Sequence, residues 1–324
     1  MRWDRTGSIK AVAALKPVEA AHSGARLGTL TAREPEPLGK RFWRRFNRNA
    51  LAVTGLVVMI GVVFTAIIGP YLVAADPNAI DYAAINSLPT GEHPFGTDNL
   101  GRDTLARMTH GLRVSLLVAA YVELLDLVLG VPLGLLAGYF GGKVDFVITR
   151  IADVLFAFPG LLLAILVAAV FGSAVTDQFG GIGRLALVAG ALSLVSWPLM
   201  TRLVRSQTLT IRERDYVTAA ASLGAGNPRI LWRHVRPQLM GLVVTTATLN
   251  VAGVIINEAV LSLLGLGIQP PDASIGKMIA DAIPYLESNT LQVAIPSAML
   301  MAIVLAVSFL GDGLRDAFAA ESQP

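Results

Sequence analysis

Long uncharged runs constrain this chain more than any other feature. Residues 50–75 contain no Asp, Glu, Lys or Arg, and about 20 apolar residues suffice for a helix to cross the hydrocarbon layer of a bilayer. Only 15% of the 324 residues are charged, and the mean hydropathy is +0.61. A water-soluble domain of this size cannot cover so much apolar surface. The sequence therefore predicts an all-α integral membrane protein.

Six runs are long and apolar enough to be spans. They are expected at Ala50–Ala75, Val114–Tyr139, Phe146–Val175, Leu185–Thr201, Leu239–Leu264 and Leu291–Gly311. The Gly141-Gly142 pair predicts a tight return after the second span. The polar, proline-containing stretch from Asp76 to Arg113 is expected to be a loop with one short helix.

The distribution of basic residues predicts how the spans are oriented in the membrane. With the N-terminus inside, the inner segments hold 21 of the 26 Lys and Arg residues and the outer segments hold 5. This bias predicts that both termini and the stretch 201–238 lie in the cytoplasm. Residues 1–40 lack the early apolar core of a cleavable signal and are expected to form a disordered cytoplasmic tail. Residues 40–48 mix aromatic and basic side chains, which is typical of an interfacial anchor.

Several classes of function are disfavoured. The chain has no cysteine, and its four histidines show no metal-ligand spacing. It contains no Gly-x-x-x-x-Gly-Lys-Ser/Thr phosphate loop and no recognisable Ser-His-Asp arrangement. We therefore expect no enzyme activity, no metal and no cofactor on this chain. The pI is basic, about 9.3, because Lys and Arg are concentrated in the inner segments. This distribution is explained by membrane orientation, so no nucleic acid partner is expected.

A charged stretch at 215–237 separates the fourth and fifth spans. It is expected to form two short helices, the first ending near Leu223 with Gly224 in the left-handed conformation. Asn227 is expected to cap the second helix with Pro228 at its first position, before the next apolar run begins at Pro237. Alanines at 219–221 leave a face of little bulk. This hairpin could dock in a groove of another protein or lie on anionic lipid.

This stretch resembles the "EAA" cytoplasmic loop of membrane subunits of ATP-binding cassette (ABC) importers. Thr218 stands where that loop usually has Glu, and Arg236 stands where it usually has an apolar residue. The resemblance implies that the loop docks onto ATPase subunits. The residues it marks for coupling are Thr218, Ala219, Ala220, Gly224, Pro228, Arg233 and Pro237.

Three further motifs sharpen the resemblance. Residues 93–103, HPFGTDNLGRD, are similar to the "HPFGTDxxGRD" signature of the dipeptide, oligopeptide and nickel permease family, in its C-type subunit. Residues 262–271, SLLGLGIQPP, resemble that family's "SFLGLGxQPP", and residues 310–316 its "LGDGLRD". The implied division of the chain is a tail at 1–40, the anchor, first span and outer loop at 41–112, a five-helix core at 113–318 with a coupling loop at 212–237, and a tail at 319–324.

The resemblance implies a Type I ABC importer fold and a permease function in the bacterial cytoplasmic membrane. The implied partners are a homologous second permease, two ATPase subunits that carry ATP and Mg, and an extracytoplasmic substrate-binding protein. Peptides are the implied solute, with nickel or another small solute as the alternative. A stand-alone secondary transporter or channel is the rival class, although no convincing internal repeat is found. A membrane scaffold without transport is a third possibility.

The outer loop carries one group of candidate site residues. Its motif supplies turn-forming and capping side chains, which suits either a structured loop or a contact with the binding protein. The residues are Gly96, Thr97, Asp98, Gly101, Arg102 and Asp103.

Acids within the spans are the other candidates, because buried charges usually face a bundle interior or a cavity. Glu258, beside Asn257, is expected to line the translocation path or to pair with a cation. Glu123 and Asp126 share a helical face. They could hold a cationic substrate, but contact with the second permease is the preferred interpretation. Asp145, Arg150 and Asp153 are expected to form an interfacial ion-pair cluster.

Overall fold

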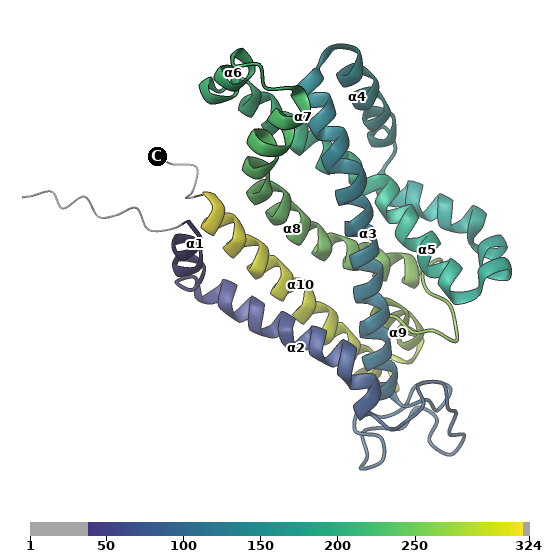
Figure 1. Ribbon diagram of the computed structural model, residues 1–324. Helices are drawn as coiled ribbons and strands as arrows, with labels where there is room; N and C mark the ends of the chain where they lie inside the picture. Colours follow the sequence, from purple (N-terminus) through teal and green to yellow (C-terminus); the bar gives the residue numbers. More distant parts are fainter. Residues whose placement is uncertain (1–37, 320–324) are drawn as a thin grey trace, which may run out of the picture. The chain divides into compact units, whose positions relative to one another are not determined.

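A computed structural model describes residues 38–319 of the chain, and regular structure in this part is helical (Figure 1). The longer helices are α2 (Ala50–Leu72), α3 (Thr104–Phe140), α4 (Gly142–Phe156), α5 (Gly160–Arg212), α8 (Arg236–Leu263) and α10 (Thr290–Ala319). The shorter ones are α1 (Leu38–Phe46), α6 (Asp215–Ser222), α7 (Asn227–Ile230), a π-helical turn (Leu231–Val235), α9 (Ile275–Ala282) and a 3-10 turn (Ile283–Tyr285). The expected tails at 1–37 and 320–324 lie outside the described residues.

Helix α5 is two antiparallel helices joined at Gly180. The backbone there has φ 61° and ψ −150°, so the chain turns back on itself (Figure 1). Gly160 consequently lies beside Val195, and Gly172 lies beside Arg184. Five helices in residues 38–319 are long and apolar enough to span a membrane. Since α5 supplies two arms, this agrees with the six predicted spans.

The predicted start of the third span is wrong. Residues 146–156 belong to α4, and the spanning arm begins only at Gly160. The chain breaks at Pro159 because proline has no N–H and disfavours helical backbone at the preceding Phe158. Helix α4 also carries Lys143, Asp145, Arg150 and Asp153, too many charges for a segment of 15 residues to cross lipid.

The outer loop also differs from expectation. Residues 73–103 contain no helix, and α3 begins ten residues earlier than predicted, at Thr104. The Asp103 side chain accepts a hydrogen bond from the Ala106 N–H at 2.7 Å, which makes Asp103 the N-cap of the helix. The tight return after α3 is confirmed, since Gly141 and Gly142 have φ values of 65° and 54°.

Helices α3 and α5 pack at close range through a line of glycines at every fourth position of α3. A Cβ added to Gly134 would lie 2.7 Å from the Thr201 carbonyl oxygen, and one added to Gly130 would lie 2.7 Å from Met200 Cβ. Gly138 meets Thr208 in the same way. Small residues with this spacing let helix backbones approach in a membrane. Helices α2 and α8 both contact α3, and α10 contacts both α2 and α8 (Figure 1).

The α3–α5 contact predicts a size limit at Gly134. Replacing Gly134 with Leu should destabilise the protein by about 1–3 kcal/mol, because overpacking forces backbone shifts, and should lower the thermal unfolding temperature in detergent. Gly61→Leu is the matched control, because nothing lies within 4 Å of a Cβ at Gly61. Equal unfolding temperatures for the two variants would contradict this packing.

Candidate functional site

The stretch 215–237 forms an elbow at one end of the bundle (Figure 1). Helix α6 ends at Ser222, close to the predicted Leu223, and Gly224 has the predicted left-handed conformation with φ +84°. The Gly224 N–H donates to the Ala221 carbonyl at 3.0 Å, and the Ala225 N–H donates to the Ala220 carbonyl at 3.1 Å. These two bonds form a Schellman motif, which satisfies the last carbonyls of the helix.

The second half of the elbow is not the separate short helix that was predicted. Helix α7 continues through the π-helical turn into α8, giving one helical segment over Asn227–Leu263. Pro237 has no N–H for the Arg233 carbonyl, and the Arg236 N–H bonds instead to the Leu231 carbonyl, five residues back. The π-helical turn therefore carries the helix past Pro237 without an interruption.

The predicted cap at Asn227 is also wrong. Gly226 occupies the cap position and supplies no side-chain bond. The Asn227 carbonyl oxygen Oδ1 instead accepts a hydrogen bond from the Tyr139 hydroxyl at 3.1 Å. Arg212 donates to the Tyr139 carbonyl at 2.7 Å. The Asn227 side chain thus ties the elbow to the end of α3.

The elbow is anchored in an apolar cluster and exposes the residues expected to couple. Val217 of α6 and Ile230 of α7 are buried with Ile211 of α5 and Leu239 of α8. Ala220 is half-buried. The other predicted coupling residues are exposed: Thr218, Ala219, Gly224, Pro228, Arg233 and Pro237. The elbow therefore exposes most of the residues expected to couple, while its buried side chains join two long helices.

Asp145, Arg150 and Asp153 do not form the ion-pair cluster with one another that the sequence predicted. Asp145 accepts hydrogen bonds from the Arg205 guanidinium, which holds the pKa of that carboxyl below its usual range. Asp153 pairs with Arg202, and Arg150 lies over the Phe146 ring, 5.2 Å from its centroid. The two ion pairs bind α4 to α5, so their role is in packing.

The outer motif residues mostly hold their own loop together. Asp98 accepts hydrogen bonds from the N–H groups of Leu100 and Arg102 at 2.9 and 3.0 Å. Its other oxygen lies 2.8 Å from Arg102 Nε and 3.3 Å from Arg107 Nε. Gly96 and Gly101 have positive φ values, and Thr97 forms an isolated bridge with Asp103. Contact of this loop with a binding protein stays a prediction.

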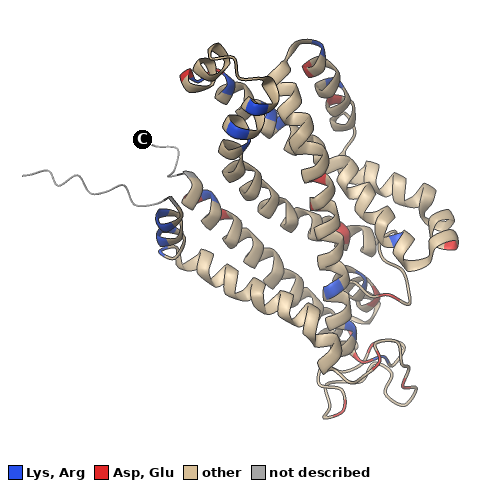
Figure 2. Ribbon diagram, in the orientation of Figure 1, with Lys and Arg blue, Asp and Glu red and all other residues tan. Residues whose placement is uncertain are grey.

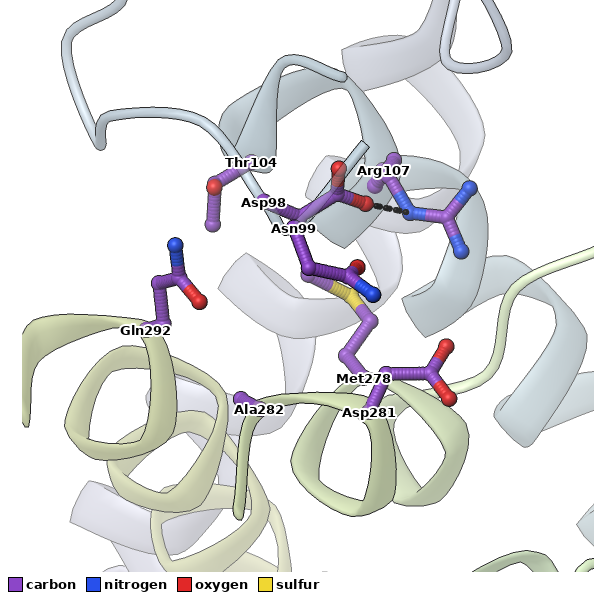
Figure 3. A pocket seen from close by; sticks show the side chains of 8 residues that line it. All are labelled: Asp98, Asn99, Thr104, Arg107, Met278, Asp281, Ala282 and Gln292. Carbon is purple, nitrogen blue, oxygen red and sulfur yellow. Dashed lines mark ion pairs between the residues drawn. The ribbon is translucent and has the colours of Figure 1, made fainter. Parts of the chain in front are cut away.

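A water-sized cavity lies between the outer loop, α3, α9 and α10 (Figure 3). Its volume is about 20 Å³, and its walls include Asp98, Arg107, Met278 and Gln292. The Gln292 amide nitrogen donates to the Thr97 carbonyl at 2.7 Å and to Asn86 Oδ1 at 2.9 Å. The loop is thereby attached to α10 as well as to α3.

Glu258 is buried near the C-terminal end of α8. It accepts hydrogen bonds from Ser262 at 2.7 Å and Ser115 at 3.4 Å. Its partners among residues 38–319 are hydroxyl groups, and none of the resolved ion pairs supports the alternative of pairing with a cation. Asn257 is half-buried. A role for either residue in the translocation path stays a prediction.

Glu123 and Asp126 lie inside the bundle, with 8% and 1% of their surfaces exposed. The Asn250 amide nitrogen donates to both, at 2.9 Å to Glu123 Oε2 and 3.0 Å to Asp126 Oδ2. The preferred interpretation, direct contact with a second permease, is corrected because these side chains are buried within their own chain. A role in holding a cationic substrate stays open.

Three polar residues that hold buried parts of the structure together were not predicted from the sequence. Arg184 is buried and donates to the Gly267 carbonyl at 2.8 Å and to the Leu266 carbonyl, so it fixes the turn after α8. Asn250 and Ser193 complete the carboxylate cluster. A lone cation or amide within an apolar run is the sequence signal that could have found Arg184 and Asn250.

Family comparison agrees with the observed architecture. Residues 130–321 match the family model described as binding-protein-dependent transport system inner membrane component, and residues 37–89 match the N-terminal transmembrane domain of oligopeptide transport permease C. The chain belongs to this permease family. It is a membrane permease subunit of an ABC importer, as the motif resemblance implied.

Curated relatives cover most of this permease. A dipeptide transport system permease protein of Alkalihalophilus pseudofirmus is 36% identical over 85% of this chain and 87% of its own length. A di/tripeptide transport system permease protein of Pseudomonas aeruginosa is 37% identical, over 87% and 92%. A glutathione transport system permease protein of Pectobacterium atrosepticum is 39% identical, over 86% and 89%.

A solved structure supports the fold. An inward-facing MetNI methionine ABC transporter has a chain that aligns with a TM-score of 0.54 at 18% identity, over 65% of this permease and 96% of the solved chain. The likeness confirms the Type I importer fold that was predicted.

The permease's outer loop gives a prediction for Asp103. Asp103→Ala removes the cap of α3 and the partner of His93, whose Nδ1 lies 2.9 Å from Asp103 Oδ2. It should lower the free energy of unfolding by about 1–2 kcal/mol, measured by thermal unfolding in detergent. Asp103→Asn retains an acceptor and should cost less than half as much. Glu92→Ala, at an exposed site of the same loop, is the control. If Asp103→Ala lowers the free energy of unfolding no more than Glu92→Ala does, the capping role is excluded.

Proposed function

We propose that this permease translocates peptides across the bacterial cytoplasmic membrane in an ATP-driven importer. Its partners are a homologous second permease, two ABC ATPase subunits and an extracytoplasmic substrate-binding protein. The dipeptide and di/tripeptide permeases among its relatives support the solute class. ATP and Mg belong to the ATPase subunits, and this chain contributes the path and the coupling elbow.

The charge distribution supports the orientation. Lys and Arg gather at α1 and the elbow, whereas acidic residues are frequent in the outer loop (Figure 2). Together with the 21 to 5 division of basic residues, this supports a cytoplasmic position for the elbow and both termini by the positive-inside rule. An ATPase subunit would meet the elbow there.

The continuous helical segment from Asn227 to Leu263 is the observation that carries this function. Closure of the ATPase pair would displace the elbow, and Val217 and Ile230 would pass the displacement to α5 and α8 through their buried cluster. Because α7 and α8 share one helix, a displacement of the elbow tilts α8. Such tilting converts an inward-open path into an outward-open one.

The proposed docking surface contains large apolar side chains that are exposed on the elbow. Leu223 is 89% exposed and Trp232 is 66% exposed. The Arg236 guanidinium lies over the Trp232 ring, 4.5 Å from its centroid. Exposed apolar groups beside basic residues are typical of a protein contact.

Leu223 should therefore be needed to bind the ATPase subunits. Leu223→Asp places a charge on the docking surface and is expected to lower the amount of ATPase that co-purifies with the permease at least tenfold. Ile182→Asp is the matched control, because Ile182 is 85% exposed next to the turn at Gly180. Undiminished co-purification of the Leu223→Asp variant would exclude this surface.

Gly224 should be needed for coupling. Nothing lies within 4 Å of a Cβ at this position, so Gly224→Val acts through its positive φ, which costs a non-glycine residue about 1–3 kcal/mol. We expect membrane insertion to persist while ATP-driven peptide uptake in proteoliposomes is lost.

Gly226→Val is the control for this experiment. Gly226 has φ −67° and ψ 151°, an extended conformation that a β-branched residue adopts readily. Normal uptake by Gly224→Val, or gradient-driven uptake by the permease without ATPase subunits, would contradict the proposed function.

A further inference from the structure

Two acids and one amide form a compact cluster in the middle of the bundle. Glu123 and Asp126 of α3 share the Asn250 amide nitrogen of α8 as their hydrogen-bond donor. Ser193 of α5 donates to the other oxygen of Asp126 at 2.7 Å. The cluster therefore joins three helices. Three of its four carboxylate oxygen atoms accept a hydrogen bond, and one does not.

That oxygen is Glu123 Oε1, which is buried without a hydrogen-bond partner in the described part of the chain. None of the ion pairs resolved in residues 38–319 includes Glu123 or Asp126. Two neighbouring carboxylates without a cation are costly in a medium of low dielectric constant. A positively charged group bound at Glu123 would remove that cost.

Glu123 lines an open cavity of about 210 Å³ between α2 and α10 on one side and α3 and α8 on the other. The other walls are chiefly apolar and include Met59, Val251, Val307 and Leu310, while Thr248 contributes a hydroxyl group. This hydroxyl donates to the Val244 carbonyl at 2.8 Å, so its lone pairs can accept a bond from a ligand.

The composition of the walls distinguishes between kinds of cation. A bare metal ion such as Ca²⁺ requires about six to eight oxygen ligands, and the cavity offers one carboxylate and one hydroxyl. A primary ammonium group needs fewer acceptors, and its bond to a carboxylate is charge-assisted. The hydrocarbon body attached to it would pack on the apolar walls.

We propose that this cavity binds a protonated primary amine carrying a short apolar group, with the ammonium held by the carboxyl group of Glu123 and the hydroxyl group of Thr248. The inference rests on the proposed function in one respect: it assigns the amine to the transported solute, as the amino end or a basic side chain of a peptide. The cavity would then favour cationic solutes within the membrane part of the path.

Equilibrium binding of radiolabelled n-butylammonium to the complete importer in phosphatidylcholine nanodiscs tests the site. We expect saturable binding that excess n-butanol does not displace. Glu123→Gln should weaken it at least tenfold, and Thr248→Val should weaken it less. Glu287→Gln, which alters an exposed carboxyl group, should leave it unchanged.

Four results would overturn the proposal. Displacement by n-butanol would identify an apolar groove for lipid tails, and absence of saturable binding would show that the assembled partners fill the cavity. Equal binding by Glu123→Gln and the wild type would exclude the carboxylate. Should Glu123→Gln fail to assemble, Met59→Trp provides the test, because it fills the cavity and leaves the acids intact. Wild-type binding by Met59→Trp would also overturn the proposal.

A parallel uptake assay separates this inference from the proposed function. The wild-type importer should take up a free tripeptide faster than the same tripeptide with an acetylated amino end, and Glu123→Gln should reduce the difference. If the wild type takes up no peptide while it binds n-butylammonium, the proposed function fails and the amine site stands. If Glu123→Gln loses amine binding but keeps the difference in uptake, the assignment of the amine to the solute is wrong.

Discussion

Backbone hydrogen bonding along one helical rod is the constraint on which the structure depends. Inside a bilayer, every N–H and C=O group must find a partner within the protein, so the chain can turn only where these bonds are completed in another way. At Pro237, at the start of the rod from Asn227 to Leu263, a π-helical turn keeps the helix continuous although proline has no N–H. Under the proposed function, a displacement at the elbow would be carried along this rod to the far end of α8.

Similar terminations occur before and after this rod. Gly224 ends α6 and Gly265 ends α8, each with positive φ and with the paired backbone bonds of a Schellman motif. The turn after α8 is further held by Arg184, which donates to the Leu266 and Gly267 carbonyls. The turn at Gly224 is exposed, whereas the turn at Gly265 is fastened to α5 through Arg184. This difference fits an input of force at the elbow and a response in the bundle.

Sequence reasoning succeeded where the signal was local. Uncharged runs indicated the spans, and the glycine at 224 indicated the end of α6, because both depend on neighbouring residues alone. It failed where a residue's partner is distant in the chain. Asn227 bonds to Tyr139 instead of capping its helix, and Asp126 bonds to Ser193 and Asn250 instead of facing a second subunit. The start of the third span was a local error, because the helix-breaking effect of Pro159 was not weighed against the apolar run.

Spin-label distances test the rigid-rod account most directly. The chain has no native cysteine, so labels can be placed at Arg229, Gly253 and Gly61, which are exposed. At 1.5 Å per residue, positions 229 and 253 should lie about 36 Å apart along the rod. The account predicts that this distance is the same in the nucleotide-free and ATP-trapped importer while the distance from 229 to 61 changes. A shift of several ångströms between 229 and 253 would show that the π-helical turn acts as a hinge, and would contradict the account.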